Sequence, residues 1–158
     1  MQDPMAMANA MMAMQRVAAE QVAAAHADLA ARGLGFGPEL QREIAAQAAA
    51  HPTPTYDEAS MQVGAAQVAQ QAMSAVYPED GFAGGDPRLE PIEGLSLPVA
   101  AIAARAVGWS TDEAFIARVA TALGFEPATY ERASAEWRAR MVADVVLGAF
   151  YGQLFSQA

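Results

Sequence analysis

The side chains best suited to chemistry gather between residues 77 and 95, in a stretch rich in acids, Gly and Pro. Carboxylate oxygens are the ligands that a hard cation such as Ca²⁺ prefers. The acids of this stretch are Glu79, Asp80, Asp86, Glu90 and Glu93. Calcium loops place their oxygens at close, fixed intervals, as in D-x-D-x-D-G, and that pattern is missing here. We therefore interpret residues 77–95 as a solvated loop and predict no bound metal.

The other reactive side chains form no familiar catalytic pattern. His26 and His51 lack the H-x-x-x-H spacing of a zinc site, and the chain has no Cys to supply thiolate ligands. No Ser lies in a G-x-S-x-G turn, and the absence of Lys excludes a Schiff base and a P-loop lysine. We predict a protein that is not an enzyme and uses no cofactor. An enzyme without familiar motifs stays as a third alternative.

Arginines cluster around a tryptophan in residues 127–141, where Arg132, Arg138 and Arg140 lie near Trp137. Such a cluster is typical of a contact site for another protein, and it also resembles the second helix of a DNA-binding helix-turn-helix. Acids are interleaved with these arginines, and the chain carries a net charge of −9. Because nucleic acid is itself an anion, this charge opposes binding to it. The sequence therefore predicts a protein partner and no nucleic-acid partner.

Helices are expected to position all of these side chains. Alanine, the best helix former, supplies 40 of the 158 residues, and no segment alternates between apolar and polar residues as a strand does. The sequence predicts an all-α fold, a compact bundle of about six helices joined by short Gly/Pro turns. The expected helices are 4–31, 38–50, 56–76, 97–107, 111–123 and 127–155, the last with a joint near Asp144 or Gly148.

The signals for these boundaries are prolines at helix starts, glycines at helix ends and hydroxyl–acid pairs. Thr55 with Glu58 and Ser110 with Glu113 have the spacing of capping boxes. The long loop at 77–95 separates an N-terminal helical part, residues 1–76, from a C-terminal module, residues 96–158. Ala-rich helices bury little area each, so we expect the two parts to pack as one domain.

One motif, L-G-F-x-P, occurs at residues 34–38 and again at 123–127, each time between two expected helices. Both copies are expected to form the same turn, in which Gly takes a left-handed helix cap and Pro starts the next helix. A duplicated module and the reuse of a common corner both explain it.

Two expected helices carry long apolar stripes with small residues. The first holds Met7, Met11, Met14, Ala18, Val22, Ala25 and Leu29, and the third holds Met61, Ala65, Val68, Ala72 and Val76. Both stripes are expected to face the core. The alternative is that the Met-rich first turns contact a partner, because Met is flexible and suits adaptable interfaces.

The segment 145–155 is apolar nearly all round, so it is either buried or completed by another chain. Trp109 and Trp137 are expected to fill the core of the C-terminal module. We take as the candidate contact surface Met5, Met7, Met11, Met12, Met14, Val146, Phe150, Leu154 and Arg138.

An L-E-P-I-x-G-x-S-L motif starts at Leu89, and a W-x-x-R-M motif starts at Trp137. With this entrance and this exit, residues 86–141 resemble a family of small uncharacterised bacterial proteins. Pro98 departs from the acidic residue of the family pattern. The resemblance implies a bacterial source and a helical domain, and it implies no activity.

Together these observations predict a non-enzymatic helical module that contacts another protein or assembles with itself. The alternative is a helical domain that binds an apolar small molecule or lipid in a pocket lined by Met and aromatic residues. The sequence shows neither a signal peptide nor an apolar run of about 20 residues, so we expect no membrane span and a cytoplasmic location.

Overall fold

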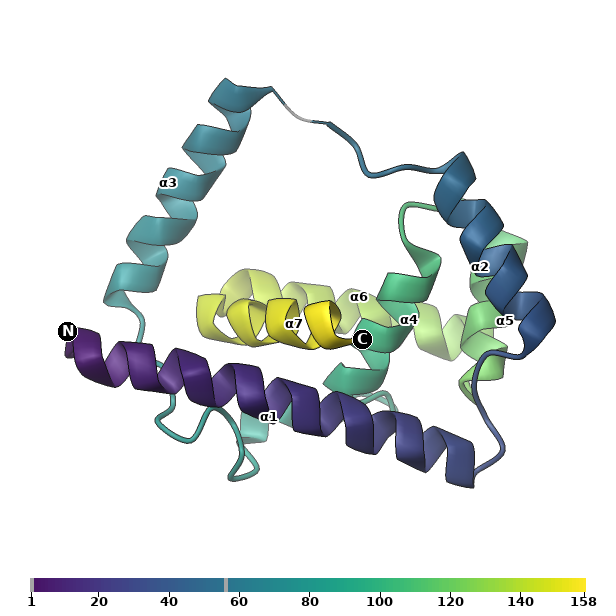
Figure 1. Ribbon diagram of the computed structural model, residues 1–158, viewed down its shortest axis with the longest axis horizontal. Helices are drawn as coiled ribbons and strands as arrows, with labels where there is room; N and C mark the ends of the chain where they lie inside the picture. The colour runs from purple at the N-terminus through teal and green to yellow at the C-terminus, as the bar shows by residue number, and fades with distance from the viewer. Residues whose placement is uncertain (1, 56) are drawn as a thin grey trace.

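The computed structural model describes residues 2–55 and 57–158, and it confirms the all-α prediction (Figure 1). The helices are α1 (Pro4–Ala31), α2 (Pro38–Ala50), α3 (Glu58–Ser74), α4 (Leu97–Val107), α5 (Glu113–Ala122), α6 (Pro127–Ala143) and α7 (Val145–Gln157). A short 3-10 turn, Pro87–Leu89, lies in the loop that follows α3. Among the described residues the only β pairing is an isolated bridge between Ile92 and Leu95. No described helix has both the length and the apolar character that crossing a bilayer requires.

Helix α7 lies at the centre of the molecule (Figure 1). It packs against α1, α4 and α6, while α2 covers α4 and α5 from the other side. One continuous core joins these helices, and its largest fully buried side chains are Trp137, Phe82, Phe115, Phe150, Met14, Leu95, Leu97, Leu123, Leu147, Leu154 and Val119. Helix α3 stands away from this body and buries none of its residues.

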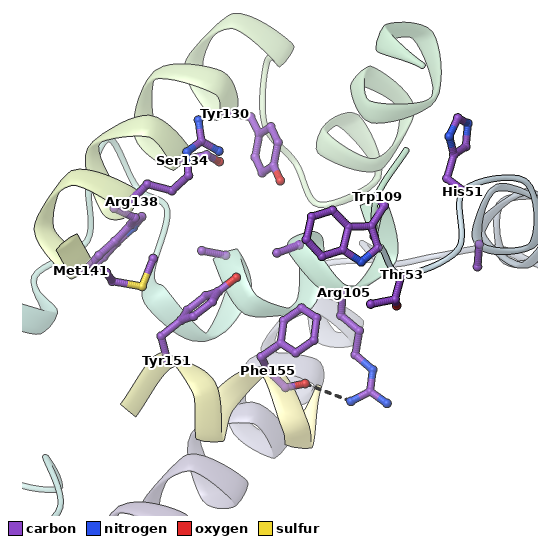
Figure 2. Close-up of a pocket in the computed structure, with 15 residues that line it drawn as sticks. His51, Thr53, Arg105, Trp109, Tyr130, Ser134, Arg138, Met141, Tyr151 and Phe155 are labelled. Atoms are coloured by element: carbon purple, nitrogen blue, oxygen red, sulfur yellow. Dashed lines mark hydrogen bonds between the residues drawn. The ribbon is translucent and has the colours of Figure 1, made fainter. Parts of the chain in front are cut away.

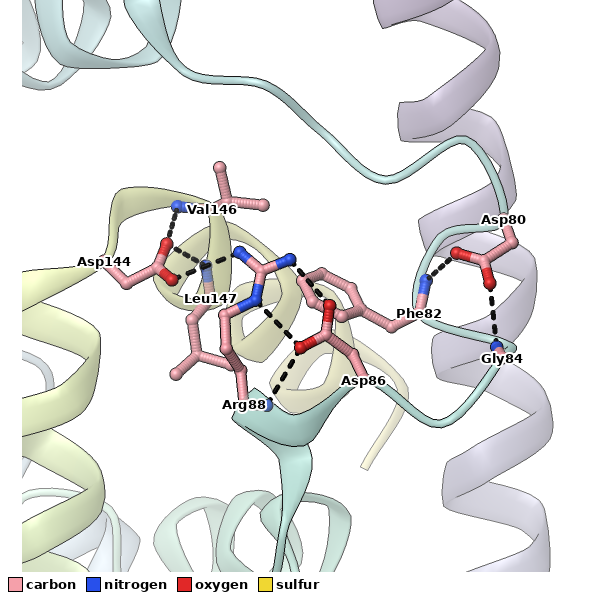
Figure 3. Close-up of polar contacts among 8 residues, drawn as sticks. All are labelled: Asp80, Phe82, Gly84, Asp86, Arg88, Asp144, Val146 and Leu147. Carbon is pink, nitrogen blue, oxygen red and sulfur yellow. Dashed lines mark hydrogen bonds and ion pairs between the residues drawn. The ribbon is translucent and has the colours of Figure 1, made fainter.

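The joint between α6 and α7 falls at Asp144, one of the two positions that the sequence indicated. Its backbone is extended there, and its carboxylate accepts hydrogen bonds from the amides of Val146 and Leu147 at 3.0 and 3.2 Å. The Arg88 guanidinium lies between Asp144 and Asp86, at 3.2 and 2.8 Å from their oxygens (Figure 3). This arrangement fastens the 77–95 loop to the start of α7.

The Asp86–Arg88 pair gives a testable dependence on pH. Hydrogen bonds from the Arg88 side chain hold the pKa of Asp86 below its ordinary value. The pair therefore stabilises the fold fully above the ordinary Asp pKa of about 4, and this contribution is lost as the pH falls through the lowered pKa. We expect Asp86→Asn to be less stable than the natural protein at pH 7, with the difference shrinking below about pH 4.

Urea unfolding followed by circular dichroism at pH 7 and in steps below pH 4 measures this difference. Glu79→Gln, a change of an exposed acid in the same loop, is the matched control and should follow the natural protein. An Asp86→Asn protein that loses equal stability at every pH contradicts the role given to the Asp86 charge.

The two L-G-F-x-P corners, residues 34–38 and 123–127, end their helices differently. The prediction that both form the same turn is therefore wrong. After α5 it is Gly124 that takes a positive φ, of 87°. After α1 the equivalent position is Gly33, with a φ of 71°, and Gly35 lies two residues further on. In each corner the residue after the capping glycine donates its amide to a carbonyl five residues earlier. The capping glycine therefore belongs to the motif in the second corner and precedes it in the first.

Candidate functional site

The structure divides the predicted contact residues into two groups. Met5, Met11 and Met12 are exposed on the first turns of α1, Met7 is half-buried, and Arg138 is exposed on α6. The others are buried, so their assignment to a contact surface is wrong; these are Met14, Val146, Phe150 and Leu154. The physical reason is that α1 packs on α7, so that the apolar faces of the two helices cover each other.

Helix α3 and the residues just after it, up to Val76, supply exposed apolar side chains, several of which the sequence assigned to the core. Met61 is 60% exposed and Val68 is 57% exposed, and Val63, Met73 and Val76 are exposed as well. The prediction that this stripe faces the core is therefore wrong. Apart from Glu58 at its start, α3 carries no charged side chain.

A pair of amide hydrogen bonds connects the end of α3 to the start of α1. The Gln2 side chain donates to the Tyr77 carbonyl oxygen at 3.0 Å and accepts from the Tyr77 amide at 3.0 Å. Residues 4–15 of α1 and residues 59–78 around α3 contain no charged side chain. The two stretches meet at one end, and each is uncharged and contains several Met residues on a strongly acidic protein (Figure 1).

A cavity of about 780 Å³ lies between α4, α6, α7 and the end of α2 (Figure 2). Aromatic and Met side chains form much of its wall, and these are Trp109, Tyr130, Trp137, Met141, Tyr151 and Phe155. The expectation that Trp137 fills the core is confirmed, since it is 1% exposed. The same expectation for Trp109 is wrong, because this residue follows the end of α4 and is 52% exposed at the mouth of the cavity.

The two tyrosine hydroxyls point into the cavity from α6 and α7 (Figure 2). Burial raises the pKa of Tyr130 and of Tyr151, while the nearby charge of Arg138 acts in the opposite direction on both. Because an ordinary tyrosine pKa is about 10, both hydroxyls stay protonated at neutral pH. Each therefore presents an O–H donor to the cavity.

The charged groups that line the cavity are all basic. Arg105 donates to the carbonyl oxygens of Phe155 and Ser156, both at 2.9 Å, and so occupies the carbonyl end of α7. Within residues 2–55 and 57–158, no carboxylate forms an ion pair with Arg138. Among the residues that the structure describes, no Asp or Glu contributes to the wall, although the protein has 18 of them.

The acids of the 77–95 loop act within the loop and on its neighbours. Asp80 accepts from the amides of Phe82 and Gly84 at 3.1 and 2.8 Å, and so holds a tight turn (Figure 3). Asp86 pairs with Arg88, as described above. In the part of the chain that the structure describes, no three His, Asp or Glu side chains lie together as a metal site would require.

Comparison with family models, with curated proteins and with solved structures gave no match for this chain. The resemblance over residues 86–141 stays a prediction that rests on its motifs. The function must accordingly be argued from the chain's own surfaces.

The cavity was missed by the sequence reasoning as a specific site, although one signal was present. On α6 the lining residues recur at helical spacing: Tyr130, Ser134, Trp137, Arg138 and Met141. Such a stripe places two aromatic residues and a cation on one face of a helix. The residues that complete the cavity come from α2, α4 and α7, and no spacing within α6 indicates them.

Proposed function

We propose that this protein is a non-enzymatic module that associates with a second copy of itself through α3 and the first turns of α1. The contact surface consists of Met5, Met11, Met12, Met61, Val63, Val68, Met73 and Val76. One observation carries the proposal, namely that α3 exposes Met61, Val63, Val68 and Met73 and has no buried residue.

A helix in that position needs a partner for its own stability. α3 has 17 residues, and an isolated helix of about this length is marginal in water even when its residues are good helix formers. Most helical stability in proteins comes from packing an apolar face, and α3, although it contacts α7, buries no residue within its own chain. A second chain on its exposed face supplies the missing burial.

The charge distribution favours a second copy as that partner. Two chains of net charge −9 repel each other over most of their surfaces. The contact surface is the place where this repulsion is weakest, since the stretches 4–15 and 59–78 are uncharged. Two copies that meet there bury Met and Val side chains and desolvate no charged side chain of these stretches.

The stripe on α3 is compatible with pairing to its own copy. In an antiparallel pair centred near Val68, Ala65 of one chain lies level with Ala72 of the other. Small residues at these two levels let the helix axes approach closely, while Met61 and Val68 fill the spaces between them. The spacing of four, three and four residues keeps these side chains on one face.

Light scattering coupled to size exclusion, over a hundredfold range of concentration, tests the proposal. We expect the natural protein to be a dimer or larger assembly. The Val68→Glu variant should have a dissociation constant at least about tenfold higher, because the pair then buries two facing carboxylates. Val142→Glu is the matched control, since Val142 is 88% exposed on α6 and is not one of the residues of the contact surface.

The control variant should keep the mass of the natural protein, and circular dichroism should show equal helix content in all three proteins. A natural protein that is monomeric at every concentration overturns the proposal. So does a folded Val68→Glu protein whose mass follows that of the natural protein.

A further inference from the structure

We propose that the cavity between α4, α6, α7 and the end of α2 binds a small molecule that joins a carboxylate to an apolar body. This binding site is separate from the contact surface on α3, so either proposal can fail without the other.

The size and walls of the cavity suit the apolar body. Its volume of about 780 Å³ lies within the range of about 300–1,000 Å³ that small-molecule sites occupy. Its lining includes the exposed rings of Trp109 and Phe155 and the buried ring of Trp137. The half-buried side chains of Tyr151 and Met141 line it as well (Figure 2). Ring faces pack well on flat or flexible apolar groups, and the thioether of Met adapts to their shape.

The charged and polar groups of the cavity suit an anion. Arg138 brings a cation that no described carboxylate pairs with, and its fork of N–H groups matches the two oxygens of a carboxylate. The hydroxyls of Tyr130 and Tyr151 point into the same space and add O–H donors (Figure 2). Tyr130 already has a side-chain hydrogen bond with Ser134, but a neutral apolar ligand offers no partner to Arg138 or to the Tyr151 hydroxyl, which disfavours it.

The distribution of acids around the cavity strengthens this argument. The protein holds twice as many acids as basic residues, 18 against 9, yet only basic side chains carry charge on the cavity wall. A neighbouring groove on the other side of Tyr130 and Ser134 does contain Glu113 and Glu131. Neither of these carboxylates forms an ion pair with Arg138 in the described structure. Arg138 lines both spaces, the groove that contains the two acids and the cavity whose described lining residues include none.

Isothermal titration calorimetry of the full chain with 2-naphthoate tests the inference. Its neutral analogue, 2-naphthalenemethanol, measures the contribution of the apolar body alone, and decanoate separates an alkyl body from an aromatic one. We expect the natural protein to bind at least one of the two carboxylates at least about tenfold more tightly than the alcohol.

The variants assign the binding to the cavity. Arg138→Gln should weaken carboxylate binding about 10- to 100-fold and leave the alcohol unchanged, because it removes only the charged donor. Tyr151→Phe should weaken carboxylate binding about 5-fold, since it removes one neutral hydrogen bond. Arg132→Gln is the matched control on the same helix, where Arg132 pairs with Glu93 outside the cavity, and it should bind as the natural protein does.

The inference is overturned if neither carboxylate binds at millimolar concentration, or if the alcohol binds as tightly as the acids. It is also overturned if Arg138→Gln and Arg132→Gln bind the carboxylates equally. Circular dichroism of each variant confirms that the helices are intact, so that a loss of binding is not a loss of fold.

Discussion

Replacing Gly81 with Ala is expected to lower the free energy of unfolding by about 3 kcal/mol, because the new methyl group meets backbone rather than side chain. A Cβ at Gly81 falls 2.4 Å from the carbonyl carbon of Ala13 and 2.4 Å from the amide nitrogen of Met14. These atoms belong to the middle of α1, which cannot yield locally as a flexible side chain does. The φ of 61° at Gly81 adds backbone strain for any residue with a Cβ.

Gly85→Ala separates the two causes of this loss. Gly85 lies in the same loop and has a φ of 78°, but a Cβ there meets no atom within 4 Å. We expect it to lose only the strain of the positive φ, about 1 kcal/mol. Urea unfolding followed by circular dichroism measures both variants. Equal losses at the two glycines contradict the close contact between the loop and α1.

Trp137→Ala is expected to lower the free energy of unfolding by about 3–5 kcal/mol, the usual range for a large aromatic residue removed from a core. Trp137 is fully buried on α6, and its indole N–H donates to the carbonyl oxygen of Leu95 at 2.9 Å. The substitution therefore opens a void and also leaves the Leu95 carbonyl without this donor. Both effects loosen the end of the 77–95 loop where it enters α4.

Two further variants divide this effect into its parts. Trp137→Phe keeps most of the ring volume and removes the N–H donor, so a loss of about 1–3 kcal/mol is expected from the unpaired carbonyl and the smaller ring. Trp109→Ala changes the exposed tryptophan and should shift stability by less than about 0.5 kcal/mol. Chemical denaturation with fluorescence detection compares all three. Similar losses of stability in Trp137→Ala and Trp109→Ala would contradict the different burial of the two residues.

Most of the fold could be predicted from local signals at helix ends. Prolines start α1, α2 and α6, and Gly108 and Gly124 end α4 and α5 at the predicted places. These signals act within a few residues, so the sequence shows them directly. The arrangement of the helices depends on contacts between distant segments, for which no local pattern exists.

The predicted capping boxes show where local reasoning fell short. α3 and α5 are capped by Asp57 and Asp112, each two residues beyond the expected hydroxyl. The Asp57 carboxylate accepts from the Ser60 amide at 2.7 Å. An aspartate that stands nearer the first turn competes with Thr or Ser for the same amides, and its negative charge also suits the helix start. Ser110 instead donates to Gln47 at 2.6 Å, a contact between distant helices.

The candidate site was less predictable than the fold for a related reason. Met11 belongs to the stripe that the spacing placed in the core, yet it is 46% exposed, so that part of the prediction is wrong. The burial of Phe150 depends on Phe82, whose ring lies 4.7 Å from it and comes from a loop that local signals mark only as irregular. The cavity likewise needs residues from four helices. Tertiary contacts decide both features, and single-sequence patterns do not report them.

Because α1 packs on α7, one face of α1 stays uncovered during much of the synthesis of the protein. A ribosome makes residues 32–144 after it has completed α1 and before it starts α7. At typical rates of elongation this takes on the order of ten seconds. Through that interval the apolar face around Met14 and Val22 lacks the helix that later covers it and is open to chaperones. Helix α1 is thus made well before the helix that completes its packing.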